Sequence, residues 1–244
     1  MSFSSPDCSP VHSVGLTTIG LDADDTLWQN EQFFRWTEKR FTELLADHAP
    51  GADIADRLLE AEKRNLQFYG FGVKGFTLSM IETAIEVTAG QVPAPVISEI
   101  LAAGREMLRH PVETLPGVRE TLEHLAGEFR LVLITKGDLF DQERKLAQSG
   151  LGDLFHAVEI VSDKTRSTYE RLFRRHGEGP ARSMMVGNSL KSDVVPAIEA
   201  GSWGVHIPHD LTWVLEHVEP PVDEPRFRSL THFGELRELV RQLA

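Results

Sequence analysis

The chain has 244 residues, 41% of them hydrophobic, and its 37 acidic residues outnumber 25 basic ones to give a formal net charge of -12. This length and composition suit a soluble globular protein with a real core, while the negative charge argues against an extended surface for polymeric nucleic acid. The single cysteine, Cys8, excludes an internal disulfide framework and fits a reducing compartment, so we expect a cytoplasmic location.

The chain begins with a polar segment, residues 1–13, which is followed by an apolar segment, residues 14–22. Residues 1–13 are rich in serine and proline and are predicted to form a flexible tail, and they lack the pattern of a signal peptide. Residues 14–22 are predicted to form a buried strand, because apolar and small residues follow one another without helical spacing until Asp22. No run in the chain approaches the ~18 apolar residues that cross a bilayer, so no membrane partner is expected.

Residues 31–110 have the pattern of helices alone. Aromatic and aliphatic residues recur at spacings of three and four in the first of these helices, as on an amphipathic helix. Glycine-rich and proline-containing stretches, GFGVKG and GQVP, separate later helices. The predicted helices cover residues 30–48, 53–69, 76–89 and 93–109. We expect an all-helical insert of roughly 80 residues, a length within the usual domain range.

From residue 111 onward, strands and helices alternate. This alternation implies right-handed crossovers and a parallel sheet that is covered on both faces. Strands are predicted at 131–134, 157–161, 183–186 and 203–207; helices are predicted at 118–125, 139–149, 169–176, 194–200 and, after an irregular stretch over 208–231, at 232–243. The predicted fold is a doubly wound, Rossmann-like α/β core made of residues 14–30 and 111–244, interrupted by the helical insert.

Reactive side chains follow the predicted strands. In open parallel sheets the ligand site lies beyond the carboxyl ends of the strands, so these segments are expected to meet. Residues two apart in an extended chain point the same way, roughly 6.5 Å apart, so Asp22 and Asp24 can face one pocket. The segments are Asp22 with Asp24, Thr135 with Lys136 and Gly137, Lys164, and GNSLKSD with Asn188 and Asp193.

Such crowded negative charge requires a positive partner. Two carboxylates repel each other by about 4 kcal/mol at 4 Å and an effective dielectric of ~20. A Mg²⁺ ion held by Asp22 and Asp193 would offset this repulsion, and Lys164 would add a fixed charge. One aspartate could then attack phosphorus while the other moves protons, with Thr135 and the amides after it holding the phosphoryl oxygens.

The run Asp22-Ala23-Asp24-Asp25-Thr26 resembles the first motif of the haloacid dehalogenase-like hydrolases. The resemblance spans residues 14–207 and includes the insert, which is similar to the helical cap of the family's phosphatases. It implies Asp22 as nucleophile, Asp24 as general acid/base whose backbone carbonyl also binds Mg²⁺, Thr135 as the second-motif phosphate binder and Lys164 as the third-motif lysine. It therefore predicts a Mg²⁺-dependent phosphatase that acts on a small phosphorylated metabolite through an aspartyl phosphate.

Two positions depart from the family pattern. Asn188 stands where most members have an acidic residue at the start of the fourth motif; its amide oxygen can still ligate a metal, but with one charge fewer, so we expect weaker Mg²⁺ binding. Lys136 and Gly137 follow Thr135 where an asparagine often follows, and Lys136 is either a substrate contact or a solvated turn residue. The predicted phosphate-binding residues are Thr135, Lys136, Gly137 and Lys164, and the predicted metal ligands are Asp22, the carbonyl of Asp24, Asn188 and Asp193.

Other readings of the same residues remain open. A 2-haloacid dehalogenase also attacks with an aspartate but lacks the second aspartate, so Asp24 argues against it. A phosphosugar mutase uses both aspartates, and Asn188 also allows a catalytically weak ligand-binding homologue. DADDTLW is similar to the first motif of some house-cleaning nucleotidases, so a nucleoside monophosphate or a sugar phosphate is a candidate substrate. The sequence leaves open whether the protein is a monomer or a homodimer.

Overall fold

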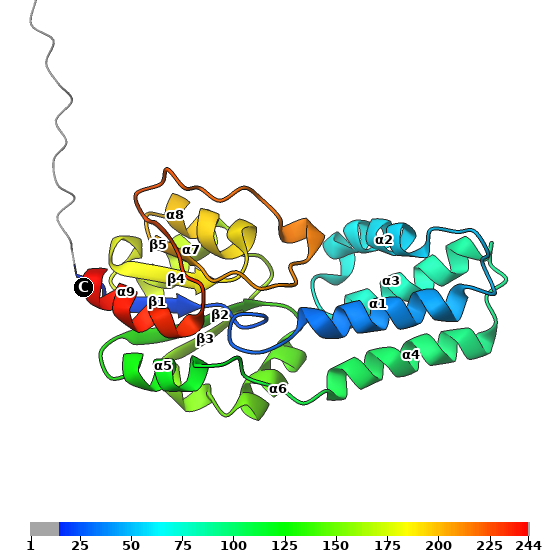
Figure 1. The fold of residues 1–244 in the computed structure, drawn as a ribbon, viewed down its shortest axis with the longest axis horizontal. Coiled ribbons are helices and arrows are strands. Elements are labelled where there is room, and N and C mark those ends of the chain that lie inside the picture. The colour runs from blue at the N-terminus through cyan, green and yellow to red at the C-terminus, as the bar shows by residue number, and fades with distance from the viewer. Residues whose placement is uncertain (1–14, 244) are drawn as a thin grey trace, which may run out of the picture.

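The computed structural model describes residues 15–243, so the predicted tail and Cys8 lie outside the described residues. The molecule is elongated, with a lobe built around a sheet beside a lobe of helices (Figure 1). The chain enters the sheet lobe, leaves it for the helices after the first strand, and then returns for the remainder of its length.

The sheet is parallel and has six strands in the order β3-β2-β1-β4-β5-β6. This is the Rossmann strand order, and the predicted fold class is confirmed. The strand order reverses between β1 and β4, which places the crevice of the fold beyond their carboxyl ends. The strands are β1 (Thr18–Leu21), β2 (Arg130–Lys136), β3 (Ala157–Val161), β4 (Ser183–Gly187), β5 (Trp203–His206) and β6 (Phe227–Ser229).

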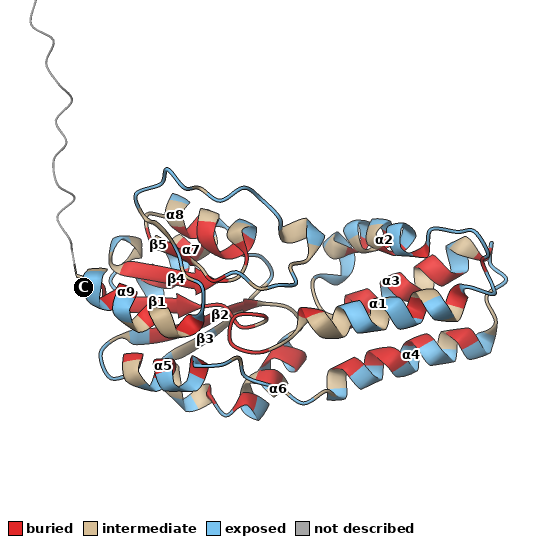
Figure 2. Cartoon of the chain, in the orientation of Figure 1, coloured by how far each residue is buried: buried red, intermediate tan, exposed pale blue. Residues whose placement is uncertain are grey.

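Helices cover both faces of the sheet, because its strands are apolar on both sides (Figure 2). Leu122 and Leu236 join one apolar cluster against the sheet, and Tyr169, Phe173 and Ala197 join another. The helices concerned are α5 (Val118–Leu125) and α9 (Leu236–Leu243) for the first cluster, and α7 (Arg166–His176) and α8 (Val195–Glu199) for the second. Helix α6 (Leu139–Ser149) follows β2 and lies beside the crevice.

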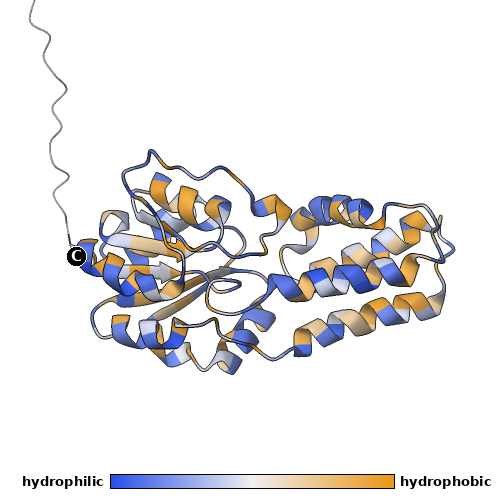
Figure 3. Cartoon of the chain, viewed as in Figure 1, coloured by the Kyte–Doolittle hydropathy of each residue, from blue (hydrophilic) through white to orange (hydrophobic). Residues whose placement is uncertain are grey.

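The helical insert consists of four helices with an apolar cluster of their own. Phe41, Leu45, Leu58, Met80 and Ile100 form this cluster, which is separate from those against the sheet. These helices have apolar residues along one side and polar residues along the other, as expected for amphipathic helices that pack only on one side (Figure 3). The helices are α1 (Glu31–Leu45), α2 (Ile54–Tyr69), α3 (Val73–Val87) and α4 (Ala94–Arg109).

Several element boundaries differ from those predicted. Helix α3 begins at Val73, so Lys74 and Gly75 are helical and only residues 70–72 form the turn, where Gly70 and Gly72 have positive φ. The stretch 208–231 is not wholly irregular, because β6 adds a short edge strand there. One π-helical turn, Leu190–Val194, precedes α8. Among the helices described, none is long and apolar enough to cross a membrane.

Candidate active site

Asp22 lies in the crevice between β1 and β4. Its backbone N–H donates to the Val186 carbonyl at 2.9 Å, which fixes the residue at the strand ends. Thr26 Oγ1 donates to Asp22 Oδ2 at 3.0 Å, while Lys164 Nζ donates to Asp22 Oδ1. Burial and the nearby Asp193 carboxylate raise the pKa of Asp22 to about 7, although Lys164 opposes this shift.

Lys164 joins two buried carboxylates that are far apart in the sequence. Its Nζ lies 2.7 Å from Asp193 Oδ1 and also contacts Asp22. Desolvation alone would lower the pKa of Lys164, but Asp193 and Asp22 outweigh it and the net pKa is raised, so the lysine stays charged. Asp193 Oδ2 accepts from the Ser189 amide at 3.0 Å. A Cβ at Gly187 would overlap the Asp193 carboxylate, so only glycine leaves room for it.

Asp24 has different surroundings from Asp22. Lys145 Nζ lies 2.9 Å from Oδ1, Gln142 Nε2 donates to Oδ2 at 2.9 Å, and Trp28 Nε1 donates to Oδ1 at 2.7 Å. Burial would raise the pKa of Asp24, but Lys145 and these donors lower it below its ordinary value. Two neighbouring carboxylates with oppositely shifted pKa values suit a pair with separate roles in acid-base chemistry.

Sequence reasoning missed Lys145 and Gln142, both on α6. They lie three residues apart and therefore share one helix face, and both are buried. The only signal in the sequence is a glutamine and a lysine on one face of the helix that follows the second motif. A solvent-exposed helix face has the same pattern, so the pattern does not indicate a buried contact with Asp24.

Asp25 anchors the start of α1. Its carboxylate accepts from the backbone N–H groups of Asn30, at 2.8 Å, and Glu31, at 3.0 Å. Asp25 has a φ of 60°, which turns the chain sharply between the strand and the helix. Burial and the adjacent Asp24 raise the pKa of Asp25 to about 6. These contacts give Asp25 a structural task at the entry to the insert.

Three oxygen positions converge beside Asp22. The terminal atom of the Asn188 side-chain amide that faces inward lies 3.3 Å from both Asp22 Oδ2 and the Asp24 carbonyl oxygen. With the amide oxygen turned inward, these oxygens have the spacing of adjacent ligands in a Mg²⁺ octahedron, about 3 Å for bonds of about 2.1 Å. With the nitrogen turned inward, the amide would donate to both oxygens instead. The residues therefore fit a small hard cation.

The other acidic groups are less free to ligate. No group of three or more His, Cys, Asp or Glu side chains within residues 15–243 suits a metal ion, so a metal here would rely on the Asn188 amide and the Asp24 carbonyl. Both Asp193 oxygens accept hydrogen bonds from the protein. The role of Asp193 as a direct ligand therefore remains a prediction.

Lys136 ends β2 and is not a solvated turn residue. Its Nζ donates to Ser192 Oγ at 2.8 Å and to Glu216 Oε1 at 2.9 Å, and it lies 3.9 Å from the centroid of the Phe71 ring. The solvated-turn alternative is wrong because β2 continues through Lys136 and the side chain is largely buried by these contacts. Its flanking residues, Thr135 and Gly137, face the same space.

Glu216 is a second group that sequence reasoning missed. It belongs to the short turn Val214–Glu216, inside the stretch predicted to be irregular. Its carboxylate accepts from Lys136 and from the hydroxyls of Ser189 and Ser192, both at 2.5 Å. Burial would raise the pKa of Glu216, but Lys136 and the two serines lower it to about 2. Glu216 is therefore an anion that links Lys136 of the second motif to Ser189 and Ser192 of the fourth motif.

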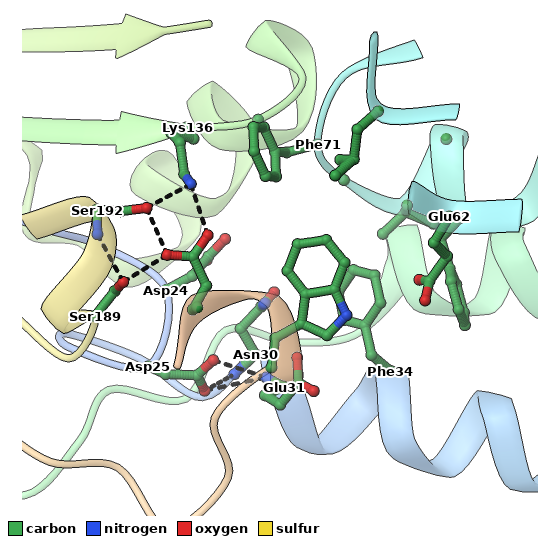
Figure 4. A pocket seen from close by; sticks show the side chains of 18 of the residues that line it. Asp24, Asp25, Asn30, Glu31, Phe34, Glu62, Phe71, Lys136, Ser189 and Ser192 are labelled. Atoms are coloured by element: carbon green, nitrogen blue, oxygen red, sulfur yellow. Dashed lines mark hydrogen bonds and ion pairs between the residues drawn. The ribbon is translucent and has the colours of Figure 1, made fainter. Parts of the chain in front are cut away.

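The charged side chains described above border one cavity of about 400 Å³ between the sheet and the insert. Figure 4 shows Asp24, Lys136 and Ser192 on one side of it, and Phe34 and Glu62 on the other. Every predicted site residue lines this cavity: Asp22, Asp24, Thr135, Lys136, Gly137, Lys164, Asn188 and Asp193. The structure thus brings together all the segments expected to meet.

A family model described as haloacid dehalogenase-like hydrolase matches residues 16–201. The chain belongs to this family. The solved haloacid dehalogenase-like hydrolase of Xanthomonas campestris is 43% identical, with a TM-score of 0.84 over 94% of this chain and 92% of that one. The predicted family is confirmed, and this haloacid dehalogenase-like protein is a hydrolase.

Two further relatives of this haloacid dehalogenase-like hydrolase differ more. The glyceraldehyde 3-phosphate phosphatase of Methanothermobacter thermautotrophicus is 26% identical over 217 residues, covering 84% of this chain and 91% of that protein. A magnesium-bound HAD-hydrolase of Bacillus subtilis shares the fold at 16% identity, with a TM-score of 0.62 over 93% of this chain and 99% of that one.

Proposed function

We propose that the protein is a Mg²⁺-dependent phosphatase that hydrolyses a small phosphomonoester metabolite through an aspartyl-phosphate intermediate. The observation that carries this proposal is the contrast between Asp22 and Asp24. Asp22 contacts Lys164 and lies in the oxygen cluster formed by its own Oδ2, the Asp24 carbonyl and the Asn188 amide, whereas Lys145 holds the Asp24 carboxylate as an anion. The similarity to a phosphatase supports phosphate ester chemistry, and the magnesium-bound neighbour supports the choice of metal.

The first chemical step would form a bond between an Asp22 oxygen and phosphorus while the bond from phosphorus to the ester oxygen breaks. Asp24, which would have to hold a proton at that moment, gives it to the departing oxygen. In the second step Asp24 takes a proton from water, whose oxygen attacks the phosphorus and releases inorganic phosphate and free Asp22. The resting structure, with Asp24 ionised, corresponds to the base of this second step.

Fixed positive groups would offset the charge of the phosphoryl group. Lys164 contributes an ammonium at Asp22, and Thr135 with the residues after it would hold phosphoryl oxygens at the end of β2. Mg²⁺ would be held by Asp22, the Asp24 carbonyl and Asn188, with Asp193 as a further predicted ligand. When bound, it would supply positive charge that reduces repulsion between the carboxylate and the substrate phosphate.

We propose that the helical insert acts as a cap. The cavity has walls from both the sheet lobe and the insert, and Lys74 of α3 lies 2.9 Å from Asp138 at the start of α6, across the boundary. A cap that closes over the cavity would exclude water and large partners, which favours small metabolites over polymers. A nucleoside monophosphate and a sugar phosphate both remain candidates, and the cytoplasmic location remains a prediction.

The deciding experiment is a screen of phosphorylated metabolites with Mg²⁺, scored as free phosphate released, with Asp22→Asn as the matched control. We expect release by the wild type, dependence on Mg²⁺ that a chelator reverses, and no turnover by Asp22→Asn. Transfer of phosphate between positions of a sugar without free phosphate would indicate a mutase. Chloride release from 2-chloropropionate without metal would indicate a dehalogenase, and ligand binding with no turnover of any compound would indicate a binding protein.

A further inference from the structure

Aromatic side chains from separate parts of the chain line the cavity that holds Asp22 and Asp24. We call them the aromatic wall: Phe34 of α1, Phe71 of the turn before α3, Phe76 of α3, and Trp213. The Phe34 and Phe76 ring centroids lie 5.1 Å apart, and those of Phe71 and Trp213 lie 6.2 Å apart at 82°. In Figure 4, Phe34 and Phe71 reach the cavity from the insert.

Burial in the protein core does not fully account for the aromatic wall. Phe76 is buried, but Phe34, Phe71 and Trp213 are only partly buried, so their rings border the open space of the cavity. Apolar surface left facing water is unfavourable, and a ligand that covers it gains free energy. A cavity of about 400 Å³ is in the size range of sites that take ring-containing ligands.

The segment that carries Trp213 is tied down on several sides. Glu216 accepts from Lys136, Ser189 and Ser192, as described above. Lys191 Nζ donates to the Leu215 carbonyl at 2.8 Å, and Arg35 of the insert donates to the Thr212 carbonyl at 3.4 Å. The strap, residues 211–216, is therefore held by both the sheet lobe and α1, which fixes where the Trp213 ring lies.

The aromatic wall also adjoins the reactive end of the cavity. The Phe71 ring lies under the ammonium of Lys136, the residue that follows Thr135 at the end of β2. A phosphoryl group at Asp22 would therefore place the remainder of a substrate within the same cavity as Phe71 and Trp213. The leaving group, rather than the phosphate, would meet the rings.

We propose that the aromatic wall selects phosphomonoesters whose leaving group carries an aromatic ring. Trp213 is the specificity-determining residue that packs against this ring, and Glu216 is a positioning residue that holds the strap. The inference rests on the proposed phosphatase function, because it requires the phosphoryl group at Asp22. Contacts between aromatic rings exceed those of a saturated ring of equal size by enough to change affinity about two- to twelvefold.

The test compares benzyl phosphate with cyclohexylmethyl phosphate, which have similar size and leaving alcohols of similar acidity. With the full-length protein and Mg²⁺, KM for benzyl phosphate should be lower by about two- to twelvefold, with similar kcat. Trp213→Leu should abolish the preference, and Trp213→Phe should keep most of it. Trp36→Leu, at a tryptophan that is 61% exposed on α1, is the matched control and should keep it fully.

A preference below about twofold in the wild type, or one that persists in Trp213→Leu, would overturn the inference. Calorimetry with benzylphosphonate and cyclohexylmethylphosphonate measures the same preference without turnover. Tighter binding of benzylphosphonate without hydrolysis of any ester would reject the phosphatase while keeping the aromatic preference. Equal hydrolysis and equal binding of both compounds would reject the preference while keeping the phosphatase.

Glu216 is tested separately as a positioning residue. Glu216→Ala should raise KM for benzyl phosphate more than for cyclohexylmethyl phosphate, and amide hydrogen exchange in residues 211–216 should become faster. Glu219→Ala, at an exposed glutamate just beyond the strap, is the matched control for both measurements. Unchanged exchange and an unchanged KM ratio in Glu216→Ala would show that Glu216 does not hold Trp213 in place.

Discussion

The ammonium of Lys145 lies 2.9 Å from Asp24 Oδ1 and 3.1 Å from Oδ2, so one helix residue contacts both oxygens of the carboxylate proposed to move protons. Asn30 Oδ1 accepts from the same Nζ at 2.8 Å, which fixes the position of the ammonium. The contact links α6 to the end of β1 and gives Asp24 a charge state that its burial alone would not favour.

Lys145→Met should shift the acidic limb of the profile of kcat against pH upward by at least about one pH unit, because the second step of the proposed reaction needs Asp24 ionised. Lys145 lowers the pKa of Asp24, so its removal raises that pKa, and activity that needs the ionised carboxylate fails at a higher pH. The measurement is phosphate release between pH 4 and 9. Lys39→Met, at an exposed lysine of α1, should leave the limb in place; a shift in both variants would contradict this account.

Lys164→Met should destabilise the protein by about 3–5 kcal/mol, because it leaves the buried carboxylates of Asp22 and Asp193 without their shared cation. Urea unfolding at pH 8 gives the free energy directly. Adding Asp22→Asn to Lys164→Met removes one of the two unpaired buried carboxylates and should recover part of the lost free energy of unfolding. If the double variant is no more stable than Lys164→Met alone, charge burial is not the cause.

Asn188→Asp should lower the Mg²⁺ concentration for half-maximal activity by about tenfold, because it adds a charged ligand beside Asp22 Oδ2 and the Asp24 carbonyl. Metal titration of phosphate release measures this value. Thr212→Asp adds the same charge to the same cavity at the strap, and it separates ligation from a general effect of charge. An equal gain in both variants, or none in Asn188→Asp, would place Asn188 away from the metal.

Glu62→Gln should stabilise the protein increasingly as pH rises from 5 to 8.5. Burial and the carboxylates of Glu38 and Glu31 raise the pKa of Glu62 to about 8, while Arg35 and Trp213 oppose the shift. The folded state therefore binds a proton that the unfolded chain has released, and stability falls as pH rises through this range. The gain in Glu62→Gln should reach at least about 1 kcal/mol, or ~2–4 °C in Tm, at the upper end.

Thermal unfolding of wild type and variant across this pH range measures the difference. Glu31 and Asp25, whose pKa values are also raised by burial, to about 7 and about 6, stay in both proteins, so most of their contribution cancels. Glu43→Gln, at an exposed glutamate of α1, should show no such pH trend. A difference that is constant with pH would mean that Glu62 is ionised throughout.

The sheet and the meeting of its polar segments could be predicted because both depend on local patterns. Apolar runs that end in polar residues mark strand ends, and parallel strands bring those ends to one edge. Asp22, Thr135, Lys164 and Asp193 were found in this way, and all line one cavity.

The partners of these residues could not be predicted. Lys145 meets Asp24 across 121 positions, and Glu216 meets Lys136 across 80, with no local pattern that marks either contact. The strand β6 was missed because three residues are too few to show an alternating period. The start of α3 was missed because Gly75 looked like part of a turn, whereas its carbonyl accepts from Ser79 within the helix.

The anchoring of α1 by Asp25 has a consequence for protein engineering. The nucleophile candidate and the residue that holds the first helix of the insert are three positions apart in one run, so the chain provides no spacer between them. A chimera that receives another insert would need its junction after Glu31, because a junction between Asp25 and Glu31 would separate the carboxylate from the native backbone N–H groups that it holds. Substitutions at Asp25 should accordingly alter the tilt of α1 before they alter the reaction itself.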